Sequence, residues 1–358
     1  MEAATATSQQ PRIVRRRGDV IREGVSRFGL YAALILPLVA FGIHDLSKDG
    51  DLTHLGTNIV SGISNGAIIA LIALGYTLVY GIIELINFAH GDLFMLGTLT
   101  SVGLYGSIGL HPGMGIVPMV LGLLAILVIA MATCALINVM IERVAYRPLR
   151  NAPKLAPLIT AVGFSFILQN VGILWIGSSP RSVPDLIDAQ HTLLKMGGVV
   201  IQNADVLAIA VTVPLVFLLT TFVARSRMGK AMRATAQDPD ASRLMGINVN
   251  TTIALTFLLG GLMAGAAGLI TALYQTSEWY FNGFRAGLFA FTAAVMGGIG
   301  NLGGAVAGGF IIGIIAQFTD DRLTNGNTWQ TAVVFAFLIV VMIFRPQGLF
   351  GEQTREAG

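Results

Sequence analysis

Long apolar runs, separated by short polar segments, fill most of the chain of 358 residues. A bilayer core of ~30 Å needs about 20 apolar residues in each helix that crosses it. On that scale the pattern predicts helices near residues 28–43, 57–83, 92–110, 116–140, 157–177, 204–224, 251–273, 284–300, 303–319 and 329–344. Since the first, eighth and ninth of these runs are short, we expect an all-α bundle with about 8–10 transmembrane helices.

The composition points to the same class of protein. Hydrophobic residues make up 54% of the chain and charged residues 11%, and the mean hydropathy is +0.74. A soluble domain carries ~25% charged residues, so the composition indicates a polytopic integral membrane protein. The 43 glycines favour tightly packed membrane helices. The net charge is only +3 and the basic residues gather in loops, which argues against nucleic acid as a partner and for charges that set the topology. As for any protein of this class, membrane lipid is an expected partner.

The basic loops also predict how the helices are oriented. Residues 142–154 and 225–248 are rich in arginine and lysine, and the positive-inside rule places such loops in the cytoplasm. With ten crossings, both termini fall on this same side and residues 178–203 face the periplasm. We therefore predict a multi-pass protein with both termini cytoplasmic.

The chain divides into four predicted regions. Residues 1–27 are polar and rich in arginine, lack the cleavage site of a signal peptide, and are expected to form a disordered cytoplasmic extension. Residues 28–56 hold an extra apolar segment and a periplasmic loop. Residues 57–351 form the transmembrane domain, which includes the cytoplasmic segment 225–248, and residues 352–358 form a cytoplasmic tail.

A polar heptapeptide, INFAHGD at residues 86–92, interrupts two apolar runs. Ionisable groups beside hydrocarbon are energetically costly, so their presence indicates function. By the predicted orientation, this motif lies at the cytoplasmic end of its two helices, where it would form a polar hinge at the inner gate. The expected hinge residues are Asn87, Ala89, His90, Gly91 and Asp92.

Each hinge residue has an expected role. Asp92 is placed to cap the following helix, and Asn87 is placed to bond free carbonyls of the preceding helix. Gly91 allows the chain to reverse, and Ala89 allows close contact with a neighbour. For His90 three roles remain open: a structural hydrogen bond, a place in the gate lining, or a function linked to protonation. One histidine with one carboxylate supplies too few ligands for a closed zinc site, so we expect neither a metal site nor a catalytic centre.

The cytoplasmic segment 225–248 carries the signals of a short helix. Asp238 suits the N-cap, Pro239 suits the first helical position, and Gly246 is a C-terminal stop. Apolar side chains on such a charged helix indicate a docking surface, and the alternative is a helix that lies back on its own bundle. The residues assigned to docking are Arg233, Asp238, Pro239, Leu244, Met245 and Gly246.

The chain lacks the G-x-x-x-x-G-K-[ST] loop that cradles a nucleotide. Gly229 and Lys230 are followed by alanine, and the upstream glycine of that loop is missing. We therefore expect no cofactor in this chain. If the protein is a pump, a separate ATPase that docks on residues 225–248 would bind the ATP.

Five collinear segments resemble the LivH-type permease of bacterial branched-chain amino acid ABC importers. They read GYTLVYGIIELINFAHGDLFMLG (75–97), IERVAYRPLR (141–150), SRMGKAMRATAQDPDASRLMGIN (226–248), FTAAVMGGIGNLGGAVAGGFIIG (291–313) and RPQGLFG (345–351). The resemblance implies the fold of an ABC importer permease, a transport function rather than an enzymatic one, and a place in the bacterial inner membrane. It also implies a second permease subunit in a hetero- or homodimer, two cytoplasmic ATPases, and a periplasmic amino-acid-binding protein.

Three other functions are weighed against this one. An intramembrane protease would need Gly-x-Gly-Asp with Tyr-Asp, or Gly-x-Ser-Gly with a distant histidine, and the sequence has neither arrangement. An ion-coupled secondary transporter usually carries carboxylates in mid-helix, whereas the carboxylates here are expected at helix ends. A urea or short-amide ABC permease stays an alternative, because related permeases carry methionine at the position of Phe88.

Overall fold

The computed structural model describes residues 39–40, 42–43, 45–47, 50–150, 152–153, 155–275 and 277–351. The predicted extension 1–27, most of the 28–43 segment and the tail 352–358 lie outside the described residues.

Within the described residues, a helix occupies each predicted range from 57–83 onward. The long helices are α2 (Thr53–Ile83), α3 (His90–Ile108), α4 (Ile116–Ile141), α6 (Leu155–Ile176), α7 (Asn203–Arg225), α10 (Val249–Tyr274), α11 (Asn282–Gly297), α12 (Leu302–Arg322) and α13 (Gly326–Phe344). Short helical segments are the π-helix η1 (Glu142–Tyr146), α5 (Arg147–Leu149), α8 (Arg227–Gln237) and α9 (Pro239–Leu244). The strands are β1 (Arg181–Ser182), β2 (Thr192–Met196), β3 (Val199–Gln202) and β4 (Ser277–Glu278).

Seven of the described helices are long and apolar enough to cross a membrane. They are α2, α4 continued through α5, α6, α7, α10, α12 and α13. The remaining two predicted ranges form α3 and α11, helices of 19 and 16 residues that pack inside the bundle. This arrangement confirms the predicted class, a polytopic all-α membrane protein.

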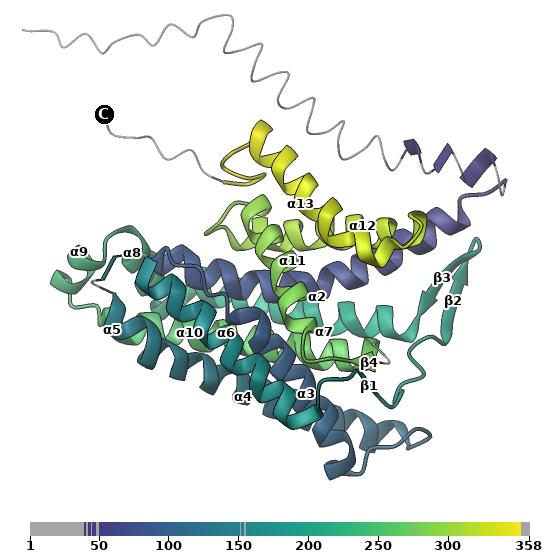
Figure 1. Ribbon diagram of the computed structural model, residues 1–358, viewed down its shortest axis with the longest axis horizontal. Coiled ribbons are helices and arrows are strands. Elements are labelled where there is room, and N and C mark those ends of the chain that lie inside the picture. Colours follow the sequence, from purple (N-terminus) through teal and green to yellow (C-terminus); the bar gives the residue numbers. More distant parts are fainter. Residues whose placement is uncertain are drawn as a thin grey trace, which may run out of the picture.

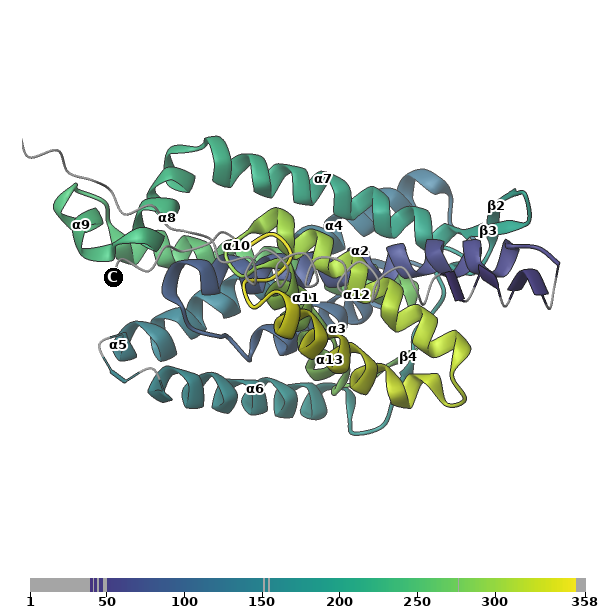
Figure 2. The same ribbon diagram turned by 90° about the horizontal axis from the view of Figure 1, so that it is seen from above.

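Two helices form the centre of the bundle. In the most apolar 18-residue stretch of α2, 78% of the residues are buried, and in the corresponding stretch of α10 72% are buried. In α7 and α13 the corresponding share is 17%. Figure 2 shows α7 and α6 along opposite flanks of the molecule, with α11, α12 and α13 between them. The flanking helices expose large apolar side chains, which is the surface that a membrane protein presents to lipid.

The connections gather at two ends of the molecule, and Figure 1 shows these ends on opposite sides. The α9 end contains α8, α9 and α5. The hairpin end contains the antiparallel pairs β2–β3 and β1–β4. The turn of the β2–β3 hairpin is Gly197-Gly198, where both residues have positive φ, as the tight turns of hairpins require.

Glycine seams hold the central helices together, as the glycine content predicted. A Cβ at Gly309 of α12 would lie 2.6 Å from the Cα of Ala70 in α2, and one at Gly265 of α10 would lie 2.7 Å from the Cα of Met131 in α4. No side chain fits in such a contact. The glycines therefore let these backbones approach directly, which is how membrane helices gain packing energy.

A buried ion pair fixes the α9 end of the bundle. The guanidinium of Arg150 bonds the carboxylate of Glu142, and the Glu142 side chain is 1% exposed. Another nitrogen of the same guanidinium donates to Oδ1 of Asn250, at the start of α10, over 2.6 Å. Arg150 therefore neutralises a buried carboxylate and links η1 to α10.

Candidate functional site

The polar motif lies deeper in the bundle than the sequence predicted. Helix α2 ends at Ile83, Glu84 adopts a left-handed conformation with φ of 51°, and residues 84–89 turn back between the helices. Asp92, two residues into α3, bonds Ser165 and Gln169 in the middle of the 22-residue α6. Asp92 therefore lies at the end of a helix, as expected, but level with the middle of α6, because the segment before it re-enters the bundle.

Four residues of the motif are buried in the bundle. Asn87, Ala89, His90 and Asp92 are each at most 1% exposed. Such polar side chains are tolerated in a protein interior only when partners replace the lost water.

The partners of Asp92 lie across the bundle and not along its own helix. Gln169 donates to one carboxylate oxygen over 3.1 Å, and the Ser165 hydroxyl donates to the other. No side chain caps the first turn of α3. Asp92 lies in that turn, where its charge suits the helix dipole, but the predicted capping role is wrong, since α6 takes the carboxylate.

Asn87 begins a chain of amide hydrogen bonds through three elements. Its Nδ2 donates to Oδ1 of Asn138 in α4 over 3.2 Å, and Nδ2 of Asn138 donates to the carbonyl of Phe257 in α10 over 2.6 Å. The hydroxyl of Tyr146 donates to the carbonyl of Ile86 over 3.1 Å. The expected bond from Asn87 to the carbonyls of the preceding helix is therefore replaced by contacts that tie residues 86 and 87 to the bundle.

His90 packs against α2 through the edge of its ring. The imidazole lies edge-on to Tyr76, with 4.9 Å between ring centroids, and fills the space that a side chain at Gly75 would take. Neither ring nitrogen has a hydrogen-bond partner among the described residues. His90 therefore packs against the middle of α2, beside the carbonyl of Ile72, and its three predicted roles stay predictions.

Gly91 provides close packing and not the predicted reversal of the chain. It lies within α3, and a Cβ at this position would overlap the carbonyl oxygen of Gly283 and lie 2.8 Å from the Cα of Gly287, both in α11. The reversal takes place earlier, at Glu84. Ala89 is fully buried, in keeping with its predicted close contact.

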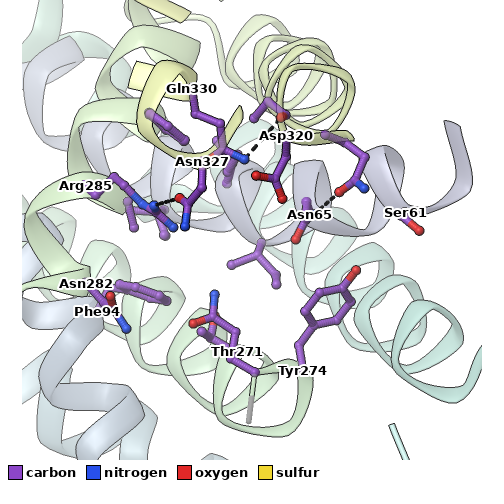
Figure 3. A pocket seen from close by; sticks show the side chains of 18 residues that line it. Ser61, Asn65, Phe94, Thr271, Tyr274, Asn282, Arg285, Asp320, Asn327 and Gln330 are labelled. Atoms are coloured by element: carbon purple, nitrogen blue, oxygen red, sulfur yellow. Dashed lines mark hydrogen bonds between the residues drawn. The ribbon is translucent and has the colours of Figure 1, made fainter. Parts of the chain in front are cut away.

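A cavity of about 350 Å³ opens among α2, α3, α10, α11, α12 and α13. Figure 3 shows polar side chains from several of these helices pointing into it. Nδ2 of Asn65 donates to Oε1 of Gln317 over 2.9 Å, and the guanidinium of Arg285 bonds Oδ1 of Asn327. The polar lining residues are Ser61, Asn65, Thr271, Tyr274, Gln275, Asn282, Arg285, Gln317, Asp320, Asn327 and Gln330.

A buried carboxyl lies beside this cavity. Nδ2 of the lining residue Asn282 donates to Oε2 of Glu278 over 3.2 Å, and Glu278 is 2% exposed. Burial raises the pKa of Glu278 to about 7, and the Asn282 bond offsets part of that rise. The Glu278 carboxyl therefore holds its proton up to a pH at which an exposed glutamate is ionised.

A second cavity, of about 870 Å³, lies at the α9 end. Its lining includes Thr77 and Gly81 of α2, Met232 and Arg233 of α8, and Asn301 before α12. Because α2 lines both cavities and His90 packs on Gly75, the start of α3 lies at the level between them.

The segment 225–248 forms the short helix that its sequence predicted. Oδ1 of Asp238 accepts from the backbone N–H groups of Asp240 and Ala241, both over 2.9 Å, and Pro239 is the first residue of α9. Gly246 ends the turn with φ of 82°. Leu244 is 90% exposed and Met245 83%, so these two apolar side chains do not pack on the bundle.

Arg233 contacts the bundle and not the exposed face of α9. Its guanidinium bonds the carbonyl of Val223, near the end of α7, and it lines the cavity at the α9 end. It therefore holds α8 against α7. The six docking residues accordingly separate into an exposed group on α9 and one residue that positions α8.

Sequence reasoning missed the cavity residues. Arg285 stood in a predicted transmembrane range and Asp320 directly after another, and an ionisable residue there is a signal of function. The glutamine and asparagine residues of α12 and α13 gave no comparable signal, because their grouping depends on how helices distant in the sequence pack together.

Comparison with known proteins identifies the family. The sequence model of the family described as "Branched-chain amino acid transport system / permease component" matches residues 58–342. The chain is 40% identical over 308 residues to the permease protein BraD of Pseudomonas aeruginosa, covering 86% of this chain and 99% of that protein. It is 39% identical over 299 residues to LivH of Escherichia coli K12, covering 83% and 95%.

A more distant relative is the fructose import permease protein FrcC of Rhizobium meliloti, 27% identical over 201 residues that cover 53% of this chain and 54% of FrcC. No solved structure matches the chain. The fold defines a multi-pass membrane protein, and the relatives are transport permeases and not enzymes. The chain belongs to the family of branched-chain amino acid transport system permease components.

Proposed function

We propose that this chain is the transmembrane permease subunit of an ATP-driven importer of branched-chain or other neutral amino acids. The observation that carries the proposal is the similarity to BraD and LivH, both named high-affinity branched-chain amino acid transport system permease proteins, over almost their whole length. A urea or short-amide permease has no counterpart among the relatives named above. The energy would come from two ATPase subunits, because the chain lacks a nucleotide-binding loop.

The proposed function also implies which partners the chain has. A periplasmic amino-acid-binding protein would deliver the substrate, and a second permease, identical or different, would complete the pathway. We infer that the ATPases dock on α9, because Leu244 and Met245 expose apolar side chains on a short charged helix. A docking partner would cover this apolar surface and so remove it from water.

The docking proposal has a direct test in the assembled complex. The wild-type complex, reconstituted in proteoliposomes with its ATPases and binding protein, should take up leucine when ATP is supplied. Leu244→Asp with Met245→Asp should abolish both the co-purification of the ATPases and this uptake, since each docked apolar side chain contributes ~1.5–3 kcal/mol. The bundle should stay folded, because both side chains are exposed.

Met196→Asp is the matched control, an apolar side chain that is 65% exposed at the hairpin end. It should leave ATPase co-purification unchanged. If the double variant keeps its ATPases and its uptake, α9 is not the docking helix. If the wild-type complex transports urea and not leucine, the substrate proposal is wrong.

We infer that the α9 end is cytoplasmic and that both termini lie on that side of the bacterial inner membrane. The arginines of η1, α5, α8 and α9 gather at this end, in keeping with the positive-inside rule. The single native cysteine, Cys134, is buried and should not react with maleimide. In intact spheroplasts, a membrane-impermeant maleimide should label Ser179→Cys and should label Asp240→Cys only after the membrane is opened. Labelling of both from outside would contradict this topology.

We further infer that residues 84–92 form the barrier between the two cavities. Support comes from the burial of residues 87 and 89–92 and from the contact of His90 with α2 between the parts of that helix that line each cavity. The non-helical residues 84–89 are the part of this segment that can rearrange without breaking a helix. The residues Asn87, Ala89, His90, Gly91 and Asp92 therefore remain our proposal for the inner gate.

A further inference from the structure

The cavity of about 350 Å³ is apolar at its floor and polar at its rim. Ile72, Phe94 and Phe289 line it and are 0%, 3% and 6% exposed. Asp320 and Asn327 are exposed and Arg285 is half-buried. Ligand pockets of ~300–1,000 Å³ typically combine an apolar lining with a few placed polar groups. This cavity therefore has the size of a small-molecule site and its combination of apolar and polar lining residues.

The rim carries one cation and one anion. Arg285 comes from the first turn of α11 and Asp320 from the end of α12, and in Figure 3 they lie on either side of Asn327. The bond that Arg285 makes is to the neutral amide of Asn327. Among the described residues, no ion pair joins Arg285 or Asp320 to an opposite charge, so both charges remain available to a ligand.

Asp321, the next residue of α12, differs from Asp320 in that its carboxylate has partners within the protein. Oδ2 of Asp321 accepts from Nδ2 of Asn58 over 2.8 Å and lies 3.0 Å from Nε of Arg322. Its other oxygen lies 3.6 Å from Nε2 of His54. Asp321 is therefore occupied by protein partners, whereas Asp320 faces the cavity.

We propose that this cavity is a transit site that holds the zwitterion of a free amino acid on its way through the permease. Arg285 would bind the α-carboxylate, helped by the positive end of the α11 dipole, and Asp320 would bind the α-ammonium group. The aliphatic side chain would lie on the floor formed by Ile72, Phe94 and Phe289. This inference rests on the proposed function and adds to it a substrate site within the permease itself.

The charge pattern distinguishes classes of substrate. Urea, a short amide or a sugar carries no charge, so it would gain no ionic contact from Arg285 or Asp320. A free amino acid carries one charge of each sign, opposite to that of Asp320 and of Arg285. The apolar floor favours aliphatic side chains over charged ones, because a buried charge without a partner is energetically costly.

The test uses the complete complex in proteoliposomes, with leucine uptake and ATP hydrolysis measured together. Arg285→Gln and Asp320→Asn should each lower the leucine transported per ATP hydrolysed by at least about tenfold, because each removes a charge-assisted contact to substrate. Stimulation of ATP hydrolysis by the leucine-loaded binding protein should persist. Arg285→Lys should keep most of the transport, since the cation remains.

Asp321→Asn is the matched control and should change leucine transport per ATP by less than about twofold, whatever it does to thermal stability. Normal transport in Arg285→Gln and Asp320→Asn would overturn the transit site, and so would an equal loss in Asp321→Asn. If Arg285→Gln fails to assemble, Asp320→Asn and Arg285→Lys decide the question. Absence of leucine uptake by the wild-type complex would instead contradict the proposed function, independently of this site.

Discussion

Replacing Gly91 with alanine should reduce leucine uptake by at least about tenfold, and replacing it with leucine should abolish uptake. The added Cβ would overlap the carbonyl oxygen of Gly283 and lie 2.8 Å from the Cα of Gly287. Both contacts are to backbone, which cannot move aside as a flexible side chain can. Overpacking in a tight interior costs ~1–3 kcal/mol and sometimes more, and here α3 would be displaced from α11 at the level between the two cavities.

Gly106 offers a control within the same helix. A Cβ at this position has no heavy atom within 4 Å, so Gly106→Ala should leave uptake at the wild-type level. The comparison is made on complexes that are purified with their ATPases, which separates loss of transport from loss of assembly. Wild-type uptake by Gly91→Ala would show that α3 and α11 tolerate a wider separation and that the contact is not needed.

The sequence predicted the elements well because their signals are local. Twenty-residue apolar runs define the membrane helices, and Asp238, Pro239 and Gly246 define the ends of α9 without reference to the rest of the fold. The exposure of Leu244 and Met245 also followed from a short charged segment between two long helices. In each case the controlling interactions lie within a few residues along the chain.

The depth of the polar motif was not predictable in this way. Hydropathy shows that Asn87, His90 and Asp92 interrupt an apolar run, but it cannot distinguish a loop at a helix end from a segment that re-enters the bundle. The left-handed conformation of Glu84 turns the chain back into the bundle, and this conformation is unusual for a glutamate. The partners of Asp92 lie more than seventy residues away in α6, so no local pattern indicates them.

The cavity was missed for the same reason. Its lining comes from six helices spread from Ser61 to Gln330, and each polar residue by itself looks like an ordinary interruption of an apolar run. Only packing groups Arg285 with Asp320. The separation of these two residues by 35 positions along the chain hides the pairing of charges that the substrate proposal depends on.

Replacing Arg150 with leucine should destabilise the permease by ~3–5 kcal/mol, because it leaves a buried carboxylate without a counter-charge. Glu142 is 1% exposed and Arg150 is its partner, and the same guanidinium holds Asn250 at the start of α10. Thermal unfolding of the purified complex should therefore begin at a clearly lower temperature. Arg143→Leu is the control, since Arg143 is exposed in the same π-helix and its loss should cost less than ~0.5 kcal/mol.

The double variant Glu142→Leu with Arg150→Leu separates the two reasons for the loss. Replacement of a buried ion pair by apolar side chains of similar volume is often neutral or stabilising, so the double variant should recover the part of the stability that Arg150→Leu loses through the unpaired carboxylate. A deficit would remain for the lost bond to Asn250, which is worth ~1.5–3 kcal/mol as a hydrogen bond to a charged group. If the double variant is as unstable as Arg150→Leu, the link from η1 to α10 and not the buried charge accounts for the loss. If neither variant is destabilised, the Glu142 side chain does not need Arg150 as a partner, and water then reaches this end of the bundle.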